Sequence, residues 1–293
     1  MHPLADARAW LMGRSAALTV RYGDRLRHAG DDLDEPETVS IPTRRGTIPA
    51  ELYRPAASER PPAVLVHLHG GAFVMRHPRM DDFWCRFVAA TTGVAVLNVD
   101  YEVAPRHRYP VAHEQSHDAV AWAQQECSSL GVDGSRLAVS GFSAGGNLAA
   151  SACLRARDEG SFHARFQLLG VPSVDVSTAD KRPVTGRSMI TPGTIALVRK
   201  TYFRDAERRS EPYASPLLAP SHSCLPPAMV VTAERDALRA EGDAYARALA
   251  EADVEVDHVV VRGRDHYFLD GRDAAHDRTV MDRMAAAVAD HLR

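Results

Sequence analysis

The sequence predicts an α/β protein with a mostly parallel central sheet and helices on both faces. Short, continuous apolar runs alternate with longer helix-like segments along most of the chain, which is the order expected of β-α-β units. The runs lack the apolar and polar alternation of a sheet with one wet face, so we expect them to be buried on both faces. With 293 residues, 45% of them hydrophobic, the chain can bury one large core.

The first part of the chain predicts a helix and then a hairpin. Residues 1–35 show an amphipathic helical pattern that turns acidic at 31–35. Val39–Ile41 and Ile48–Tyr53 flank Arg44-Arg45-Gly46, which indicates an antiparallel hairpin. Buried strands are expected after it at Ala63–Leu68, Val94–Val99, Leu137–Val139, Phe166–Val171, Ala228–Thr232 and Val254–Val261. Helices are expected at about 80–92, 111–129, 144–158, 239–252 and 275–292.

The stretch from Thr178 to Leu225 departs from this alternation. It is rich in Arg, Pro and Ser around a single expected helix at Ile195–Phe203, and it is too long for an ordinary connection. We therefore expect residues 36–293 to form the main α/β domain, with 178–225 inserted into it. The insertion and the N-terminal segment 1–35 would together form a small helical cap over the site.

Composition and charge exclude several classes of function. The net charge is −3 with both signs interspersed, so neither a nucleic acid nor an acidic polymer is expected as a partner. No stretch approaches the roughly 18 apolar residues of a membrane span and the start is not signal-like, so we expect a cytoplasmic protein without membrane contact. A homodimer is left open. The scattered cysteines include no C-x-x-C pair and are expected as reduced thiols: Cys85, Cys127, Cys153 and Cys224.

The pentapeptide Gly141-Phe-Ser-Ala-Gly145 is the most informative motif. It has the pattern G-x-S-x-G and lies between an apolar strand-like run and a helix-like run. This context is typical of a nucleophile elbow, in which a tight turn presents the serine at a helix N-terminus. By itself the pattern is also compatible with an ordinary glycine-rich turn. The candidate nucleophile is Ser143.

Two further residues follow strands in the order that a serine hydrolase needs. A serine hydroxyl requires a base within hydrogen-bond reach and a carboxylate that orients the base. In a sheet of this kind the expected chain order is Ser, then Asp or Glu, then His. Asp236 follows the expected strand at 228–232, and His266 follows the strand that ends near Val261. Both lie at carboxyl ends of strands, where ligands bind in open α/β sheets.

An oxyanion hole is the second chemical requirement. One donor is expected to be the N–H of Ala144, directly after the nucleophile. The others are expected from the loop His69-Gly-Gly-Ala-Phe73, which follows the strand at 63–68. Glycines there let backbone N–H groups approach a substrate closely. We expect Gly71 and Ala72 to donate, with Gly70 and Gly71 as the alternative pair.

Taken together, these blocks resemble a known family, the hormone-sensitive-lipase-like esterases, which are the bacterial group IV of the α/β-hydrolases. The resemblance runs from about residue 40 to the C-terminus. Five segments are similar to the family's HGGGF/W, DYRLAPEHPFP, GDSAGG, DPLRDEG and HGF blocks: His69-Gly-Gly-Ala-Phe73, Asp100-Tyr-Glu-Val-Ala-Pro-Arg-His-Arg-Tyr-Pro110, Gly141-Phe-Ser-Ala-Gly-Gly146, Glu234-Arg-Asp-Ala-Leu-Arg-Ala-Glu-Gly242 and His266-Tyr-Phe268.

This resemblance implies a carboxylesterase that acts on small-molecule esters with short acyl groups beneath a small helical cap. Serine, imidazole and water would do the chemistry, so no cofactor or metal is expected. The same machinery could instead hydrolyse amides, lactones or acetylated small molecules. A ligand-binding receptor on this fold is a rival from another class, although the intact triad argues against it.

The sequence also departs from the family's blocks. Phe142 stands where the family usually has Asp, Ala72 where the third Gly usually lies, and Tyr267 where Gly is usual. Glu102 and Arg106 exchange the charges of the family's Arg and Glu. These changes bear on substrate preference more than on the chemistry, because no triad member is lost.

The aromatic side chains near these blocks are candidates for substrate contact. We expect Phe73, Phe142, Trp84 and Tyr267 to bind substrate. For the group Phe83, Trp84 and Phe87, core packing and a role in the acyl pocket are equally compatible with the sequence.

One further motif would point to different chemistry. His113-Glu-Gln-Ser-His117 has the H-E-x-x-H pattern of zinc proteases. No third ligand follows at the expected distance, and the segment coincides with the helix after the family's second block, so we expect no metal site. His67 is expected in the core, and His69 is expected to organise the oxyanion loop.

Overall fold

The computed structural model describes residues 2–20, 23–56, 60–183 and 186–293. Within them, eight strands form one sheet in the order β1-β2-β4-β3-β5-β6-β7-β8. β1 pairs with β2 and β2 with β4 in antiparallel fashion, and all other pairs are parallel. The predicted fold class is confirmed. The strands are β1 (Glu37–Thr43), β2 (Gly46–Tyr53), β3 (Ala63–Leu68), β4 (Ala95–Val99), β5 (Asp133–Phe142), β6 (Phe166–Gly170), β7 (Ala228–Ala233) and β8 (Val256–Val261).

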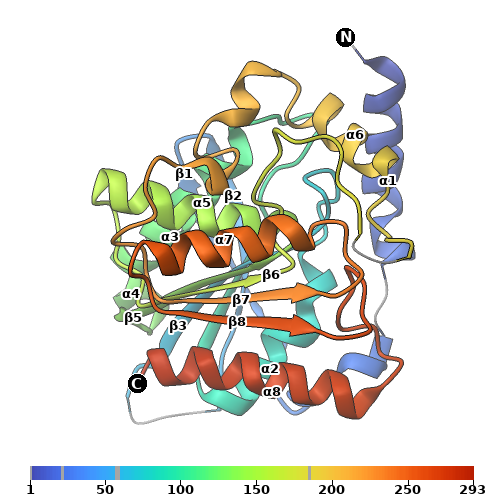
Figure 1. Ribbon diagram of the computed structural model, residues 1–293. Helices are drawn as coiled ribbons and strands as arrows, with labels where there is room; N and C mark the ends of the chain where they lie inside the picture. Colours follow the sequence, from blue (N-terminus) through green and yellow to red (C-terminus); the bar gives the residue numbers. More distant parts are fainter. Residues whose placement is uncertain (1, 21–22, 57–59, 184–185) are drawn as a thin grey trace.

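Helices cover both faces of the sheet (Figure 1). α2 (Asp82–Thr92) and α8 (Ala274–His291) pack together on one face. α3 (Val111–Gln125), α5 (Ala144–Glu159) and α7 (Arg239–Glu251) lie on the other. The helix expected at 111–129 is interrupted at Glu126, and the short α4 (Cys127–Leu130) completes it.

The continuous apolar runs are explained by this two-sided cover. Every residue of β3 is buried. Val64, Val66 and Leu68 belong to the core cluster that includes α3 and α5, whereas Ala63 and Leu65 belong to the cluster that includes α2 and α8. Because successive side chains of a strand point to opposite faces, a strand with helices on both faces needs apolar residues at every position.

Two further helices lie on the side toward which the parallel strands point (Figure 1). α1 (Pro3–Thr19) lies beside α6 (Pro192–Thr201), where Thr191 caps α6 by accepting the N–H of Thr194. Short 3₁₀ helices η1 (Gly23–Leu26), η2 (Pro78–Asp81), η3 (Glu207–Ser210) and η4 (Pro216–Leu218) complete the described elements. The helical pattern expected over 1–35 therefore ends at Thr19 in the described chain, apart from η1; residues 21 and 22 lie outside the described residues.

The buried face of α1 differs from the one its leucines suggest. Leu11 and Leu18 are 62% and 69% exposed, whereas Ala9 and Ala16 are buried. The reason is a close backbone approach: a Cβ added to Gly13 would lie 2.7 Å from the carbonyl oxygen of Val74. Only small residues fit on that side of the helix.

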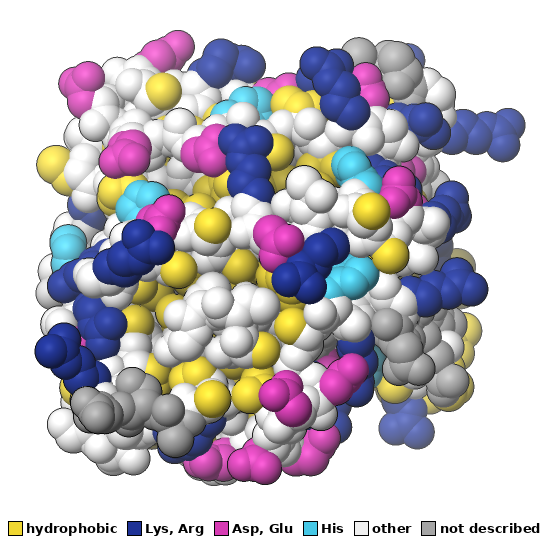
Figure 2. Space-filling model, turned by 90° about the horizontal axis from the view of Figure 1, so that it is seen from below, with side chains coloured by type: hydrophobic (Ala, Val, Ile, Leu, Met, Phe, Trp, Pro, Cys, Tyr) yellow, Lys and Arg dark blue, Asp and Glu magenta, His cyan; other side chains and the backbone are white. Residues whose placement is uncertain are grey.

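The outer surface carries both signs of charge. Figure 2 shows the face seen from below, where basic, acidic and histidine side chains are interspersed among hydrophobic ones. Among the described residues, no helix is both long and apolar enough to cross a bilayer. The four cysteines are free thiols, with Cys85 and Cys153 buried and Cys224 exposed.

Candidate active site

Ser143 occupies a strained turn between β5 and α5. Its φ and ψ are 56° and −113°, a backbone conformation that L residues rarely adopt. The turn is possible because the flanking glycines lack side chains. A Cβ on Gly145 would lie 1.8 Å from the carbonyl oxygen of Leu68, and one on Gly141 would lie 2.2 Å from that of Gly145. This is the geometry expected of a nucleophile elbow.

The structure brings the three candidate catalytic side chains together. Nε2 of His266 lies 2.8 Å from Oγ of Ser143, and Nδ1 of His266 lies 2.7 Å from Oδ2 of Asp236. Asp236 follows β7 and His266 follows β8, so adjacent parallel strands deliver both groups to the same edge of the sheet. Oδ1 of Asp236 accepts the N–H of Leu238 at 3.0 Å, which fixes the carboxylate.

The electrostatics of His266 suit a general base. Burial lowers the pKa of its imidazole, but attraction to the Asp236 carboxylate and the hydrogen bond between them outweigh this effect. The pKa of His266 is therefore raised above its ordinary value. The hydrogen bond from Nδ1 to Asp236 leaves Nε2 free to accept the proton of Ser143.

The loop after β3 forms a tight turn that borders the same cavity as the serine. Gly71, Ala72 and Phe73 all have positive φ, at 114°, 54° and 56°. The carbonyl oxygen of Gly71 accepts the N–H groups of Val74 and Met75 at 3.0 and 2.9 Å, which closes the turn.

Three backbone amides next to Ser143 lack a partner. Within the described parts of the chain, the N–H groups of Gly71, Ala72 and Ala144 donate to no protein acceptor. The N–H of Gly70, in contrast, donates to Oδ2 of Asp81 at 3.3 Å. The structure thus corrects the alternative in which Gly70 is an oxyanion donor, because its amide is already engaged.

His69 organises this loop, as expected. Its Nδ1 lies 2.7 Å from the carbonyl oxygen of Gly70, and its ring stacks on that of Tyr101 at 4.3 Å between centroids. The hydroxyl of Tyr101 donates to the carbonyl oxygen of His69 at 2.6 Å. Burial lowers the pKa of His69 to about 4, so the imidazole is neutral near pH 7 and donates through Nδ1.

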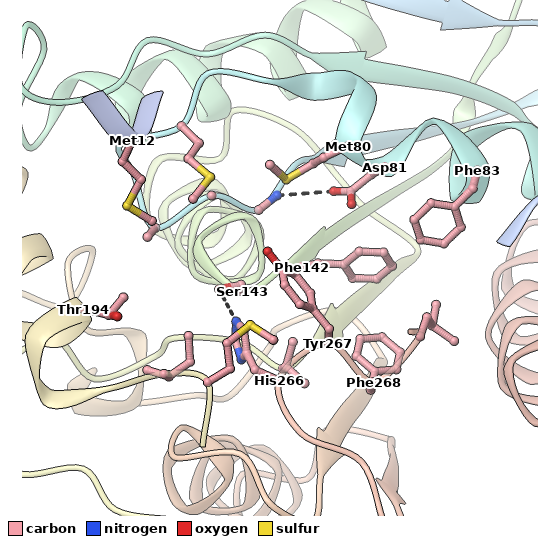
Figure 3. A pocket seen from close by; sticks show the side chains of 18 residues that line it. Met12, Met80, Asp81, Phe83, Phe142, Ser143, Thr194, His266, Tyr267 and Phe268 are labelled. Atoms are coloured by element: carbon pink, nitrogen blue, oxygen red, sulfur yellow. Dashed lines mark hydrogen bonds between the residues drawn. The ribbon is translucent and has the colours of Figure 1, made fainter. Parts of the chain in front are cut away.

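Two cavities meet at Ser143. The first encloses about 800 Å³, including space open to solvent. Figure 3 shows Ser143 hydrogen-bonded to His266 in this cavity, with Phe83, Phe142 and Phe268 gathered on one side. The second encloses about 450 Å³ and also reaches Ser143. Side chains of α6, the loop before it and the loop at 173–181 line it: Ser173, Val176, Thr178, Lys181, Ile190, Thr194, Ile195, Val198 and Arg199.

Comparisons with known proteins agree with this geometry. A family model described as alpha/beta hydrolase fold matches residues 65–270. The chain belongs to this family. An arylesterase of Saccharolobus solfataricus is 34% identical over 254 residues, which cover 86% of this chain and 82% of the arylesterase. A solved esterase structure from Pyrobaculum calidifontis superposes with a TM-score of 0.83 at 33% identity, covering 98% of this chain and 93% of that chain.

The predicted relationship to hormone-sensitive lipase is also confirmed. Human hormone-sensitive lipase is 35% identical over 154 residues, which cover 47% of this chain and 14% of the lipase. Together with the family model and the arylesterase, this match places the hydrolase among the hormone-sensitive-lipase-like esterases.

The aromatic residues of the hydrolase divide between cavity and core. Phe142 and Tyr267 line the first cavity and Phe73 lines the second. Trp84 is fully buried and lines neither; it packs behind Phe142, with ring centroids 5.9 Å apart. The structure corrects the prediction for Trp84 because the helical turn of α2 directs its neighbour Phe83 toward the cavity instead.

The H-E-x-x-H segment forms part of the scaffold. Nδ1 of His113 lies 2.9 Å from the hydroxyl of Tyr202, and Nε2 lies 2.8 Å from Oδ1 of Asn147. Nε2 of His117 lies 2.7 Å from Oγ of Ser161. Burial lowers the pKa of His113 to about 3. These imidazoles hold α3 to its neighbours, and protein atoms already occupy the nitrogens that a metal would need.

Sequence reasoning missed two kinds of residue at this site. Asp81 is the last residue of η2 and reaches the oxyanion loop, although no motif marks it. Met12 of α1 and Met189 before α6 line the first cavity from segments far apart in the chain. The apolar character of both methionines was visible in the sequence, but which of them would face the cavity depended on tertiary packing.

Proposed function

We propose that this hydrolase is a serine carboxylesterase that works through an acyl-enzyme. The observation that supports this most directly is the hydrogen-bonded series Ser143, His266 and Asp236, with distances of 2.8 and 2.7 Å, beside a cavity. Ser143 is the proposed nucleophile, His266 the general acid and base, and Asp236 the group that orients it.

The reaction follows from the positions of these groups. Oγ of Ser143 attacks the ester carbonyl carbon while Nε2 of His266 takes the hydroxyl proton. The carbonyl oxygen becomes an oxyanion and receives the N–H groups of Gly71, Ala72 and Ala144. Collapse of the tetrahedral intermediate breaks the ester bond, and His266 gives its proton to the departing alcohol. Water then attacks the acyl-enzyme by the same route, which releases the acid and restores Ser143.

A small cap over the strand ends is part of the proposal. It comprises the N-terminal segment 1–35 and the inserted segment 178–225. Met12 from the first segment and Met189, Ile190 and Thr194 from the second all line the first cavity. Apolar walls contributed from two sides limit the acyl group that fits. Acyl chains of about two to eight carbons should react best, with about 0.8 kcal/mol gained for each buried methylene until the cavity is full.

Turnover of a series of p-nitrophenyl esters from acetate to palmitate tests this proposal. We expect a maximum among the short chains and steep loss beyond them. Faster turnover of palmitate than of butyrate would contradict the proposed acyl preference. Matched butyrate esters and butyramides in the same assay separate an esterase from an amidase.

Labelling with a fluorophosphonate tests the catalytic assignment itself. The reagent should modify Ser143 of the native protein and leave the Ser143→Ala variant unlabelled. A ligand-binding receptor on this fold would remain unlabelled and would not turn over any ester.

A further inference from the structure

Asp81 is a buried carboxylate that contacts the oxyanion loop without belonging to the triad. It ends η2, its side chain is 6% exposed, and it borders the first cavity. Its Oδ2 accepts the N–H of Gly70 at 3.3 Å, as the second dashed line in Figure 3 shows. The same oxygen lies 3.1 Å from Nε2 of His67. Asp81 therefore joins the loop to the core of the sheet.

The hydrogen bonds continue from His67 to the strand that carries the nucleophile. Nδ1 of His67 lies 2.8 Å from Oγ of Ser140, and the two residues are paired in the register of β3 and β5. Each polar hydrogen of this series has an acceptor within reach. Ser140 donates to Nδ1, while Nε2–H of His67 and N–H of Gly70 both donate to Asp81. The chain of bonds thus connects β5, three residues before Ser143, with the oxyanion loop.

The position of Gly70 explains why this bond matters for the chemistry. Its carbonyl group shares a peptide plane with the N–H of Gly71, one of the three unpartnered amides. That carbonyl oxygen is held by His69 at 2.7 Å, and the N–H on the other side of Gly70 is held by Asp81. A glycine turns freely about both of its backbone bonds. The two hydrogen bonds therefore fix the direction in which the Gly71 N–H points.

Aromatic rings shield this network from water. The ring of Phe142 lies edge-on to His67, with centroids 5.1 Å apart. It also contacts the rings of Trp84 and Phe268. Hydrogen bonds in such an apolar surrounding are stronger than in water, and losing one partner is correspondingly costly. Asp81 thus supplies the carboxylate that contacts the oxyanion loop. Phe142, the residue before the nucleophile, supplies the ring that covers His67.

We propose that Asp81 is a positioning residue for ester hydrolysis, which holds the oxyanion loop through the N–H of Gly70. It acts on the reaction through the orientation of the Gly71 and Ala72 amides and makes no contact with the reacting atoms. This proposal rests on the proposed esterase function. It predicts that Asp81 contributes to kcat and leaves binding of the substrate ground state nearly unchanged.

Replacement of Asp81 tests this role with p-nitrophenyl butyrate as the substrate. Removing a whole oxyanion donor typically lowers kcat by about 100- to 1,000-fold. Asp81→Ala keeps the amide donors of Gly71 and Ala72 but removes the hydrogen bond that fixes their orientation. We therefore expect kcat to fall by about 10- to 100-fold, with KM within about twofold of native. Asp81→Asn retains an acceptor oxygen and should recover kcat to within about fivefold of native.

The neighbouring residue provides a matched control. Asp82 carries the same charge one position along, but its partners are Arg27, Tyr53 and Arg86 rather than the loop. Asp82→Asn should leave kcat within about twofold of native even where it lowers Tm. Circular dichroism and thermal melts establish that each variant is folded. Where Asp81→Ala does not fold, Asp81→Ser replaces it, because the shorter hydroxyl does not reach the Gly70 amide.

The possible results separate this proposal from the proposed function. A native protein that turns over no ester and is not labelled by fluorophosphonate would refute the esterase assignment and the role of Asp81 with it. An active native protein whose folded Asp81→Ala variant keeps native kcat would refute only the role of Asp81. A raised KM with unchanged kcat would refute it as well, since Asp81 would then be a substrate contact.

Discussion

The two walls of the site are built on different physical principles. On the sheet side, Ser143, Asp236 and His266 each follow a strand and are joined by hydrogen bonds of 2.7 and 2.8 Å. On the opposite side, Met12 and Met189 line the cavity through flexible apolar side chains. Directional bonds fix atoms to fractions of an ångström, whereas methionine packing adapts to shape. The first wall should therefore determine rate and the second should determine which acyl group fits.

The two walls are nevertheless connected by hydrogen bonds. The hydroxyl of Ser188, just before α6, donates to Oδ1 of Asp265 at 2.9 Å and accepts the N–H of Ala237 at 3.1 Å. Asp265 and Ala237 are the sequence neighbours of His266 and Asp236. Ser188 thus ties the inserted segment to both catalytic loops, and the N–H of Met189 adds a second bond to Asp265 at 2.7 Å.

Removal of a reacting group should have the largest effect. Ser143→Ala or His266→Ala eliminates the covalent route, so kcat should fall by several orders of magnitude while the fold survives. Steady-state kinetics and thermal melts measure the two quantities separately. Near-native turnover in either variant, with contaminating esterase excluded, would mean that the nucleophile is assigned wrongly.

Replacement of the orienting carboxylate should lower the rate and also shift its pH dependence. Asp236→Asn should reduce kcat by about four orders of magnitude, as loss of the equivalent carboxylate does in serine proteases. His266 must be neutral to act as a base, and Asp236 raises its pKa. In native protein kcat/KM should therefore rise with pH through a pKa above the ordinary value, and in the variant this rise should move to lower pH. An unshifted profile would show that a different group limits the reaction at low pH.

A pair of substitutions at Ala72 distinguishes the backbone from the side chain of the oxyanion loop. Ala72→Pro removes the N–H and cannot adopt a φ of 54°. The activation free energy for kcat should therefore rise by about 3 kcal/mol or more, which lowers kcat. Ala72→Gly keeps the N–H and favours positive φ, so kcat should stay within about threefold of native. A folded proline variant with native kcat would show that this amide does not face the oxyanion.

The smallest effect is expected on the cap side. Met12→Ala enlarges the first cavity, so the preferred acyl chain should lengthen by about two carbons, at about 0.8 kcal/mol for each extra buried methylene. The rate with acetate should change little. Leu11→Ala is the matched control, since Leu11 is the adjacent residue of α1 and is 62% exposed. A large loss of kcat for every ester in the Met12 variant would contradict the separation of the two walls.

The local sequence pattern was sufficient to predict the site residues on the sheet side, but it was insufficient to predict those on the cap side. A strand buried on both faces, a glycine turn and a helix leave direct traces in the sequence, so the positions of Ser143, Asp236 and His266 at strand ends could be predicted. Hydrogen-bond partners that meet only in the folded chain leave no such trace in the sequence. His67 and Asp81 are 14 residues apart, and no pattern in the sequence around them predicts the contact.

The second feature that the sequence did not predict is which face of a helix is buried. Trp84 and Phe83 are adjacent on α2, yet one lies in the core and the other borders the cavity. On α1, the close approach of Gly13 to Val74 leaves room only for small residues, so Ala16 is buried and Leu11 is exposed. In both cases the packing partner decided the face, and the partner is distant in sequence.

The close contacts of Gly141 and Gly145 also determine how this enzyme can vary. Neither glycine can acquire a side chain, because a Cβ would collide with backbone oxygen. Ser143 is needed for the proposed chemistry, and Ala144 is buried at the start of α5. Within the elbow, Phe142 lines the first cavity beside Ser143, whereas Ala144 lines the second. A substitution at Phe142 would reshape the acyl site and at the same time uncover the hydrogen bonds of His67, so substrate range and the setting of the oxyanion loop should change together.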